Sequence, residues 1–264
     1  MLEAYRTPDR LRARIAFHER YAGKGEDFHQ RLFSLVCERV EPAADARVLE
    51  VGSGTGRLWT MNAERVPPGW RITLTDASEG MVEAARGAAA DPGLAASVAR
   101  ADVQELPFEA DSFDLAFANH MLYHVPDLPR GIAELRRVVR PGGWLVAATN
   151  GEAHLAAVRD LVAPLAGVAT LHGVEPLSFT LENGAALLGA EFREVEAVRM
   201  DDALEVDDPE VLLAYLRSMV YLPDEPSQAV VRRVTEFEES VRRRLDAGPL
   251  GVRRSTGFFL ARAG

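Results

Sequence analysis

Three glycines at alternate positions are the first residues in the chain that suggest chemistry. The apolar run Val48–Val51 leads into Gly52, Gly54 and Gly56, and a helical pattern starts near Arg57. Glycine allows a tight turn and lets the backbone approach a bound molecule closely. The free N–H groups at a helix start can donate hydrogen bonds to an anionic group or a carboxylate. The loop therefore predicts a ligand site, and the alternative is a tight turn that binds nothing.

Two carboxylates lie where a nucleoside ligand would need them. Asp76 ends the apolar segment WRITLTD, 20 residues after Gly56, and a carboxylate there can accept hydrogen bonds from both hydroxyls of a ribose. Asp102 follows the next strand pattern, close to the expected place of an adenine edge. A dinucleotide fingerprint would need a small residue in place of Arg57, and a P-loop would need Lys-Ser or Lys-Thr after the glycines. The spacing therefore disfavours a nicotinamide oxidoreductase and a P-loop protein.

Polar side chains follow two further strand patterns, at the sheet edge where ligands bind in α/β proteins. His120 comes directly after FDLAFAN, with His124 one helical turn later, and Asn150 and His154 follow GWLVAATN. An imidazole titrates near neutral pH and can act as a general base, so His120 and His154 are candidate catalytic residues. All four side chains are candidate contacts for the molecule on which the protein acts. The alternative for each histidine is ordinary packing or helix capping. No compact spacing of His, Asp and Glu indicates a metal site, and we expect none.

Two segments outside this edge are predicted to cover the site. Tyr21 lies in HERYAGKGEDF, a glycine-flanked joint between two helical patterns that can fold over a ligand as a lid. Asn183, with Phe179 and Glu182, stands at the start of a later helical pattern and is a further candidate contact. The alternatives are a solvent-facing helix end for Tyr21 and local packing for the second segment.

The elements that must position these residues alternate between strand and helix periods. Strand patterns fall at 47–52, 70–76, 97–102, 113–119 and 143–150, and helical patterns fall at 28–40, 76–90 and 128–139. This alternation predicts an α/β fold with right-handed crossovers and a parallel sheet. Beyond residue 150 we expect helices near 152–166, 180–189, 208–220 and 227–246, and an antiparallel edge formed by strands at 191–200 and 256–263.

Composition and charge exclude several classes of protein. The 264 residues include 40 acidic and 30 basic side chains, for a formal net charge of -10. A chain this acidic is poorly suited to bind nucleic acid or an anionic membrane by long-range attraction. The single cysteine, Cys37, cannot form an internal disulfide, and no signal peptide or membrane-spanning run is visible. We expect a cytoplasmic protein that binds neither nucleic acid nor membrane, and its oligomeric state is left open.

Four segments together resemble a known family. They are EVGSGTG, TLTDAS, ADVQELPFEADSFDLAFANHMLYHVPD and LRRVVRPGGWLVAATN, and they are similar to the motif series of class I S-adenosylmethionine (SAM) dependent methyltransferases, most of all the ubiquinone-biosynthesis-like, small-molecule branch. The resemblance covers about residues 45–150. It implies a Rossmann-like α/β fold, with a mostly parallel sheet, an antiparallel edge strand and helices on both faces. It also implies one domain over 1–264, divided into an N-terminal helical lid (1–44), a SAM-binding core (45–150) and a substrate cover with edge strands (151–264).

The resemblance also implies roles for individual residues around SAM and its product, S-adenosylhomocysteine. The glycine loop would lie under the methionine portion, the second strand end would hold the ribose, the third would hold the adenine, and the fourth would receive the ammonium group through its backbone. The residues carried over are Glu50 as the acidic anchor of the loop, Gly52, Gly54 and Gly56, then Asp76, Ala77, Asp102, Val103 and Asn119.

The expected reaction is methyl transfer to a small organic acceptor by in-line displacement. A sulfonium donor is already activated, so positioning supplies much of the rate and a base is needed only if the acceptor must lose a proton. The segment Asn119–Leu122 lacks the Pro-Pro motif of amino-methylating DNA enzymes, and Cys37 lies too early for a pyrimidine-methylating nucleophile. Methylation of a protein or other macromolecule, and a non-catalytic SAM-binding module, stay open as alternatives.

Overall fold

The computed structural model describes residues 8–21, 27–171 and 175–264. Contacts divide the chain into two compact units. Unit 1 contains residues up to 25, 152–176 and 201–255, and unit 2 contains 26–151, 177–200 and 256–264. The chain therefore passes between the units several times. The expectation of one domain with three consecutive parts stays a prediction.

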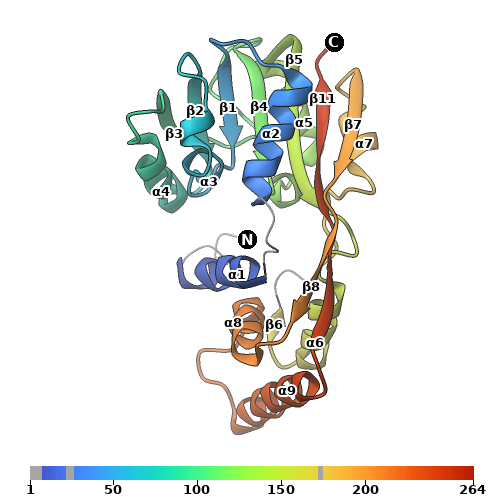
Figure 1. Cartoon of the computed structure of the whole chain (residues 1–264). Coiled ribbons are helices and arrows are strands. Elements are labelled where there is room, and N and C mark those ends of the chain that lie inside the picture. Colours follow the sequence, from blue (N-terminus) through green and yellow to red (C-terminus); the bar gives the residue numbers. More distant parts are fainter. Residues whose placement is uncertain (1–7, 22–26, 172–174) are drawn as a thin grey trace. The chain divides into compact units, whose positions relative to one another are not determined.

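Unit 2 is built on a seven-stranded sheet with the order β3-β2-β1-β4-β5-β11-β7 (Figure 1). The strands are β1 (Arg47–Val51), β2 (Arg71–Asp76), β3 (Ala96–Arg100), β4 (Phe113–Asn119), β5 (Val139–Asn150), β7 (Glu194–Arg199) and β11 (Thr256–Arg262). The first five pair in parallel, and β11 pairs antiparallel with both β5 and β7. The predicted parallel sheet and its antiparallel edge are confirmed.

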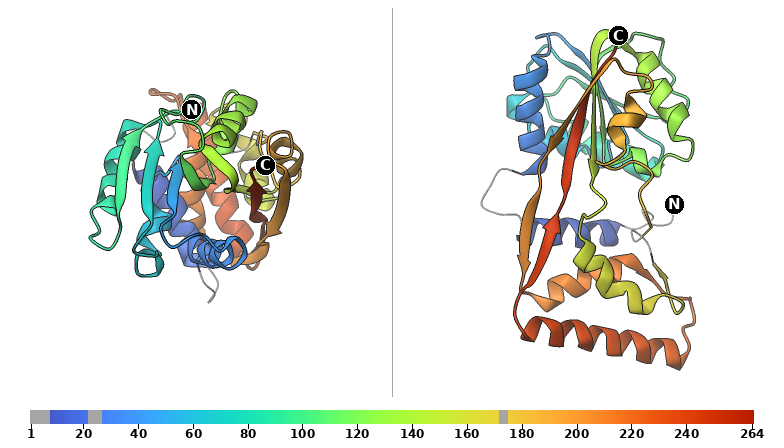
Figure 2. Two further views of the ribbon diagram at one scale, coloured as in Figure 1. Left: turned by 90° about the horizontal axis from the view of Figure 1, so that it is seen from above. Right: turned by 90° about the vertical axis from the view of Figure 1, so that its right-hand side faces the viewer.

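Helices cover both faces of this sheet, as the edge-on view in Figure 2 shows for α2 and α5. One face packs against α2 (Phe28–Val40), α3 (Arg57–Thr60) and α4 (Glu79–Ala89), and the other packs against α5 (Leu128–Val138) and α7 (Gly184–Leu188). Successive strand residues point to opposite faces, so Val48 lies in the first core and Leu49 in the second. This alternation leaves the strand ends free to carry polar residues.

Some element bounds differ from the sequence prediction, for local reasons. The third strand ends at Arg100 and not at 102, because the Asp102 carboxylate accepts the N–H of Gln104 in a turn. The helix expected at 180–189 begins only at Gly184, because the hydroxyl of Thr180 accepts the N–H of Asn183 and holds a turn before it. Short side-chain acceptors compete with the helix in this way.

Unit 1 has a hydrophobic core of its own. It contains α1 (Pro8–Tyr21), α6 (Ala156–Val162), β6 (Thr170–Leu171), β8 (Asp202–Val206), α8 (Pro209–Met219), β9 (Val220–Tyr221), α9 (Gln228–Asp246) and β10 (Leu250–Arg254). Helix α1 packs against α8 and β8, α6 against β10, and α9 against α8. The antiparallel pair of β8 and β10 was not predicted, although Leu204 and Val206 alternate with polar residues as a half-buried strand requires. No helix within the described ranges is both long and apolar enough to cross a bilayer.

Candidate functional site

Strand β1 lies between β2 and β4, and the sheet extends from it in opposite directions, through β2 and β3 on one side and through β4 and β5 on the other. In open α/β sheets, ligands bind at such a switch point, beyond the carboxyl ends of the strands. The glycine loop follows β1, Asp76 ends β2 and Asn119 ends β4. The structure therefore brings these three predicted features to one edge of one sheet.

All three glycines of the loop have left-handed backbone, with φ of 61° at Gly52, 55° at Gly54 and 72° at Gly56. A side-chain carbon added to Gly52 would lie 2.7 Å from Cβ of Met121, and one added to Gly56 would lie 2.6 Å from Cβ of Ala88. A carbon on Gly54 would meet no atom of the described chain within 4 Å. The outer glycines are thus required by the protein's own packing, and Gly54 is the one that leaves room for a ligand.

A carboxylate is buried one residue before the end of β1. Glu50 is only 3% exposed, and its Oε2 accepts a hydrogen bond from Nε1 of Trp59 at 2.6 Å while its Oε1 accepts one from Nδ2 of Asn119 at 2.8 Å. Burial raises the pKa of Glu50 to about 7; the two hydrogen bonds oppose this shift, and the negative charge of Asp76 adds to it. Glu50 therefore titrates near neutral pH.

Two buried polar oxygens at the ends of β1 and β4 have no hydrogen-bond partner among the described residues. They are Oδ1 of Asn119, whose Nδ2 is used by Glu50, and Oγ of Ser53, inside the glycine loop. A buried polar atom without a partner is costly and calls for an explanation such as an absent ligand or water. The amide oxygen of Asn119 is suited to accept a hydrogen bond from a cationic donor.

Asp76 is half-buried and already holds the loop in place. Its Oδ2 accepts the N–H of Gly54 at 3.0 Å, and its Oδ1 accepts the N–H of Ser78 at 2.9 Å. An ionised carboxylate has about four acceptor positions, so both oxygens retain capacity for hydroxyl groups of a ligand. The next residue, Ala77, is exposed beside it.

Asp102 lies on a turn after β3 and is exposed, whereas the side chain of the next residue, Val103, is buried. Its carboxylate accepts hydrogen bonds from the backbone N–H of Gln104 at 2.9 Å and from Nε2 of the same residue at 3.0 Å. The Oε1 atom of Gln104 in turn accepts the N–H of Asp127, the residue that caps α5. The side chain of Gln104 thus links Asp102, the predicted adenine contact, to the start of α5 by hydrogen bonds.

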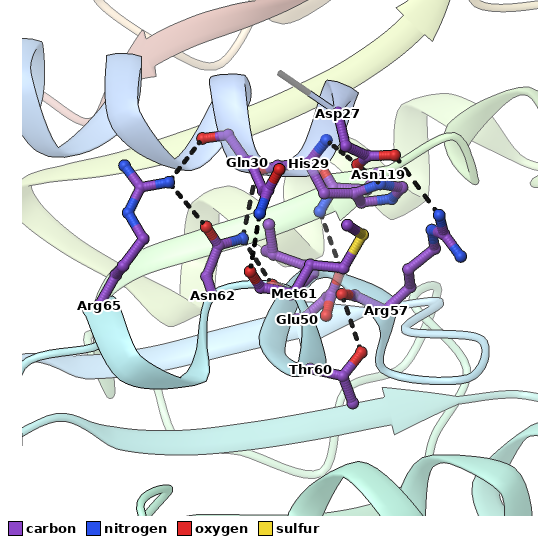
Figure 3. Close-up of polar contacts among 11 residues, drawn as sticks. Asp27, His29, Gln30, Glu50, Arg57, Thr60, Met61, Asn62, Arg65 and Asn119 are labelled. Carbon is purple, nitrogen blue, oxygen red and sulfur yellow. Dashed lines mark hydrogen bonds and ion pairs between the residues drawn. The ribbon is translucent and has the colours of Figure 1, made fainter. Parts of the chain in front are cut away.

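Helix α2 is fastened to the segment that follows the glycine loop (Figure 3). Asp27 caps α2 by accepting the N–H of His29, and a second oxygen of Asp27 lies 3.4 Å from Arg57. Burial alone would raise the pKa of Asp27, but the hydrogen bonds from His29 and the charge of Arg57 hold it well below its usual range. Asn62 donates to the carbonyl of His29 and accepts from Arg65. These contacts hold α2 next to the site.

Comparisons with known proteins agree with this arrangement. Residues 49–147 match the model of the "Methyltransferase domain" family. Nocamycin O-methyltransferase of Saccharothrix syringae is 30% identical over 217 residues, covering 74% of this chain and 76% of the relative. Malonyl-[acyl-carrier protein] O-methyltransferase of Geobacter sulfurreducens is 34% identical over 226 residues and 80% of both chains. The chain belongs to the class I SAM-dependent methyltransferases.

Further similarities extend to one more named methyltransferase and to a solved structure. A ubiquinone/menaquinone biosynthesis C-methyltransferase of Cupriavidus pinatubonensis is 33% identical over 113 residues, which are 43% of this chain and 46% of the relative. The crystal structure of YcgJ from Bacillus subtilis covers 88% of this chain and 98% of its own, with a TM-score of 0.60 and 16% identity. The second likeness supports the Rossmann-like fold alone. The predictions of family and fold are confirmed.

The methyltransferase holds His120 in an unusual backbone conformation directly after β4. Its φ is 52°, its N–H donates to the carbonyl of Ala148, and its ring centroid lies 5.0 Å from that of Phe28 on α2. His124 packs its ring against Tyr123 at 4.5 Å. His120 therefore lies next to Asn119 at the end of β4. Its contact with a methyl acceptor stays a prediction.

The predicted contacts Asn150 and Asn183 are connected through the turn before α7. The carbonyl of Asn150 accepts the N–H of Leu181 at the end of β5. The side chain of Asn183 accepts the N–H of Thr180 at 2.7 Å and donates to the carbonyl of Ser178 at 3.1 Å. The side-chain amide of Asn183 thus stabilises the turn before α7. Contact with a methyl acceptor stays a prediction for both asparagines.

Tyr21 and His154 belong to unit 1 and not to the sheet unit. The Tyr21 hydroxyl accepts the N–H of Asp208 at 2.9 Å and lies 3.3 Å from Oδ1 of Asp207, so it is engaged at the start of α8. The glycine-flanked joint after Tyr21 lies outside the described residues. Nδ1 of His154 lies 3.0 Å from the carbonyl of Ser255, also in unit 1. Their predicted roles toward an acceptor are not tested by these contacts.

Sequence reasoning missed several residues that shape the site. Asp27 stands directly before a helical pattern, and an aspartate there is a common helix cap that could have been found. Arg57 was noticed only as a mismatch to the dinucleotide fingerprint. Ser53 and Gln104 gave no signal, because their roles depend on backbone groups brought in by the fold.

Proposed function

We propose that the methyltransferase transfers the methyl group of SAM to a small organic acceptor by in-line displacement. The observation that carries the proposal is the unpaired, buried Oδ1 of Asn119 beside the buried carboxylate of Glu50. Together they offer a hydrogen-bond acceptor and a negative charge where the resemblance expects the ammonium group of SAM. A cationic amino group is the ligand chemistry that both would favour.

The remaining residues of this edge fit the nucleoside portion. Gly54 leaves open space in front of its backbone, and the lone pairs that Asp76 does not use would accept the ribose hydroxyls. Ala77 and Val103 would contact the adenine ring, and the Asp102 carboxylate would accept from its amino group. The outcome would be a cofactor held along the ends of β1, β2 and β3.

When bound, SAM supplies a sulfonium methyl group that needs no further activation. Glu50 and Asn119 would fix the amino-acid end, and Asp76 the ribose, so that the transferring carbon is held in one place. Holding the methyl group and the attacking atom of the acceptor close together and aligned accounts for much of the rate in such a displacement. If the acceptor must lose a proton, His120 is the titratable ring placed after β4 to accept it.

The names of the relatives favour oxygen as the atom that is methylated. The two relatives that align over most of this chain are both O-methyltransferases by name. One of them acts on malonyl-[acyl-carrier protein], so an acyl group carried on a protein is the second candidate acceptor. A free small molecule is the first candidate, because nocamycin and ubiquinone/menaquinone, the compounds in the names of two other relatives, are small molecules.

Calorimetry with S-adenosylhomocysteine, SAM and NAD tests the cofactor. We expect the first two to bind and NAD not to bind; NAD binding without S-adenosylhomocysteine binding would overturn the proposal. Asp76→Ala should weaken S-adenosylhomocysteine by about 1.5–3 kcal/mol, the range for hydrogen bonds to a charged group. Because Asp76 also holds Gly54, Asp76→Asn is the matched variant, which keeps the size of the side chain and one acceptor.

Methyl-labelled SAM then tests the acceptor. Pools of small hydroxylated compounds and of acyl groups loaded on a carrier protein would be incubated with the enzyme and read by product mass. Labelled product from the free compounds supports the first candidate, and product from the carrier protein alone supports the second. Failure to label anything while S-adenosylhomocysteine binds would favour a non-catalytic SAM-binding module.

A further inference from the structure

The turn that follows β3 is fastened to helix α5 within unit 2. The N–H of Glu105 donates to the carbonyl of Asp102 at 3.0 Å and closes the turn. Nε of Arg130, on α5, donates to the carbonyl of Gln104 at 2.8 Å. Between them, the side chain of Val103 is buried in the core against which α5 packs. The backbone of the turn is therefore held in one place relative to α5.

The side-chain amide of Gln104 joins Asp102 to the start of this helix. Nε2 of Gln104 lies 3.0 Å from Oδ1 and 3.0 Å from Oδ2 of Asp102, and Oε1 accepts the N–H of Asp127 at 3.0 Å. The reversed amide would turn its oxygen toward the carboxylate and its NH₂ group toward an N–H donor. Only one orientation of the amide therefore satisfies both neighbours, and Gln104 is fixed at both ends.

These bonds use most of the acceptor capacity of Asp102. An ionised carboxylate has about four acceptor positions, two on each oxygen. Oδ1 accepts both the backbone N–H and Nε2 of Gln104, whereas Oδ2 accepts Nε2 alone. No other residue of the described ranges bonds this carboxylate. The position that remains is on Oδ2, and a ligand can reach it because Asp102 is exposed.

The charge of Asp102 is not neutralised by a neighbouring cation. The nearest arginine of the next helix, Arg130, directs its guanidinium group to Oε2 of Glu105 at 3.4 Å. Within the part of the chain that the structure describes, no arginine, lysine or histidine forms an ion pair with Asp102. The donors it meets are N–H groups of the uncharged Gln104. The remaining lone pair on Oδ2 is thus that of an ionised acceptor.

Without the Gln104 amide, an exposed aspartate would be much less restricted. A side chain of this kind has about three staggered χ1 positions, and the fraction of molecules in the one that suits a ligand scales the affinity. Release of Asp102 would therefore weaken a ligand that uses it by up to about threefold. The backbone N–H bond at Oδ1 would still restrict the side chain, so threefold is the upper value.

We propose that Gln104 is a positioning residue that makes Asp102 select a purine with an amino group at carbon 6. The free lone pair on Oδ2 accepts the N–H of that amino group. A purine with a carbonyl oxygen at carbon 6 presents an acceptor to an acceptor and is disfavoured. This inference rests on the proposed function, because it takes the base of SAM to lie at Asp102. Gln104 acts only through the carboxylate.

S-adenosylhomocysteine and S-inosylhomocysteine test the selection, because they have nearly the same shape and carry an amino group and a carbonyl oxygen, respectively, at carbon 6. Both would be titrated by calorimetry into the full-length protein at pH 8. We expect the wild type to prefer S-adenosylhomocysteine roughly 12- to 160-fold, the value of one hydrogen bond to a charged group. Equal affinity for the two would overturn the proposal.

Two variants of Gln104 separate its bond to Asp102 from its bond to α5. Gln104→Glu keeps an oxygen for the N–H of Asp127 but loses the donor toward Asp102 and adds a like charge beside it. Gln104→Met loses both bonds. We expect Gln104→Met to lower the preference by up to about threefold and Gln104→Glu to lower it at least as much. Glu105→Gln, on the same turn, should leave it unchanged. A wild-type preference in Gln104→Glu would overturn the proposal.

A double variant tests whether Gln104 acts through the carboxylate. In an Asp102→Ala background, Gln104→Met should have no further effect on the preference, because the two changes are coupled. A purely structural role of Gln104 would instead weaken both ligands equally, with or without Asp102, and that result would overturn the proposal. Urea unfolding shows that each variant is folded.

The same titrations distinguish this inference from the proposed function. Failure of S-adenosylhomocysteine to bind the wild-type protein would remove the proposed cofactor, and the role of Gln104 with it. Binding of S-adenosylhomocysteine without a preference over S-inosylhomocysteine would leave the cofactor in place and remove only the role of Gln104.

Discussion

Binding of the cofactor product should release a proton from Glu50. The carboxyl group is buried and its pKa is raised to about 7 in the free protein. A ligand ammonium group at Asn119 would place a positive charge beside it, and an opposite charge favours the ionised form. The pKa of Glu50 therefore falls on binding, and the proton leaves.

The size of the effect follows from the position of this pKa. At pH 6 about nine in ten molecules of the free protein carry the proton on Glu50, and at pH 8 about one in ten do. Binding should release about 0.9 proton at pH 6 and about 0.1 at pH 8, and the affinity should rise about tenfold between them. The affinity improves as pH rises to about 7 and levels off above it.

Calorimetry in two buffers of different ionisation enthalpy measures the number of protons released. S-adenosylhomocysteine would be titrated at pH 6, 7 and 8 into the wild-type protein and into Glu50→Gln, which keeps the shape of the side chain but cannot titrate. Subtracting the number of protons released with Glu50→Gln from the number released with wild type removes the contribution of the ligand's own ammonium group. 5′-Methylthioadenosine, which lacks the amino-acid end, should release no proton from either protein.

One result would refute this reasoning directly. If wild type and Glu50→Gln release the same number of protons at pH 6, the raised pKa of Glu50 is not linked to the ligand. The ammonium group would then lie away from Glu50 and Asn119, and the proposed placement of the amino-acid end of SAM would be wrong.

Three further predictions address the same edge of the sheet. Gly56→Ala should lower the free energy of unfolding by more than the ~1–2 kcal/mol of left-handed strain, because the added methyl group would clash with Ala88. Gly54→Ala should lower it by the strain alone, but it should weaken the binding of S-adenosylhomocysteine. Urea unfolding measures the first effect and calorimetry the second. Trp59→Phe removes a donor from Glu50 and should cost about 1–3 kcal/mol at pH 8 but less at pH 5, where the carboxyl is protonated, as urea midpoints would show. His120→Ala, assayed with an acceptor found by labelling, should raise the acceptor KM with little change in cofactor affinity; a loss of kcat of roughly 10²–10⁴-fold would instead mark His120 as a general base.

Much of unit 2 could be predicted because its signals are local. A buried parallel strand is a short apolar run, as in Val48–Val51, and a left-handed turn requires glycine wherever it occurs. Asp76 at the end of β2 and Asp102 in the turn after β3 could also be found, because each follows directly on a short strand pattern. Each of these signals is contained within a few residues, so no knowledge of the strand order is needed to find it.

The partners of Glu50 could not be predicted, because they depend on strand order. Glu50 pairs in register with Phe117 of β4, and only this parallel pairing brings Asn119 within reach of its carboxylate. Trp59 reaches the other oxygen from a helix of only four residues, which is too short to give a periodic pattern. Side-chain pairs of this kind follow from the tertiary fold.

The grouping of His154 with the sheet edge shows a second limit. The prediction placed His154 beside Asn150 because His154 is only four positions further along the chain, and it extended the edge of the sheet through Gly151. The structure assigns residues from 152 onward to unit 1, where His154 meets the carbonyl of Ser255. Closeness in sequence to a strand end therefore does not place a side chain at that strand end.

Three costly features of unit 2 lie close together, and this argues for a ligand there more strongly than any single motif. A buried carboxylate, an unpaired amide oxygen on Asn119, and a left-handed histidine at 120 all lie within one residue of the ends of β1 and β4. A strained conformation costs of order 1–3 kcal/mol, and an unsatisfied buried acceptor a similar amount. Local rules are usually broken where function requires it, and the rest of the sheet follows them closely. A cation bound at Asn119 would satisfy the unpaired oxygen and neutralise Glu50 together, so the same event would remove two of these costs.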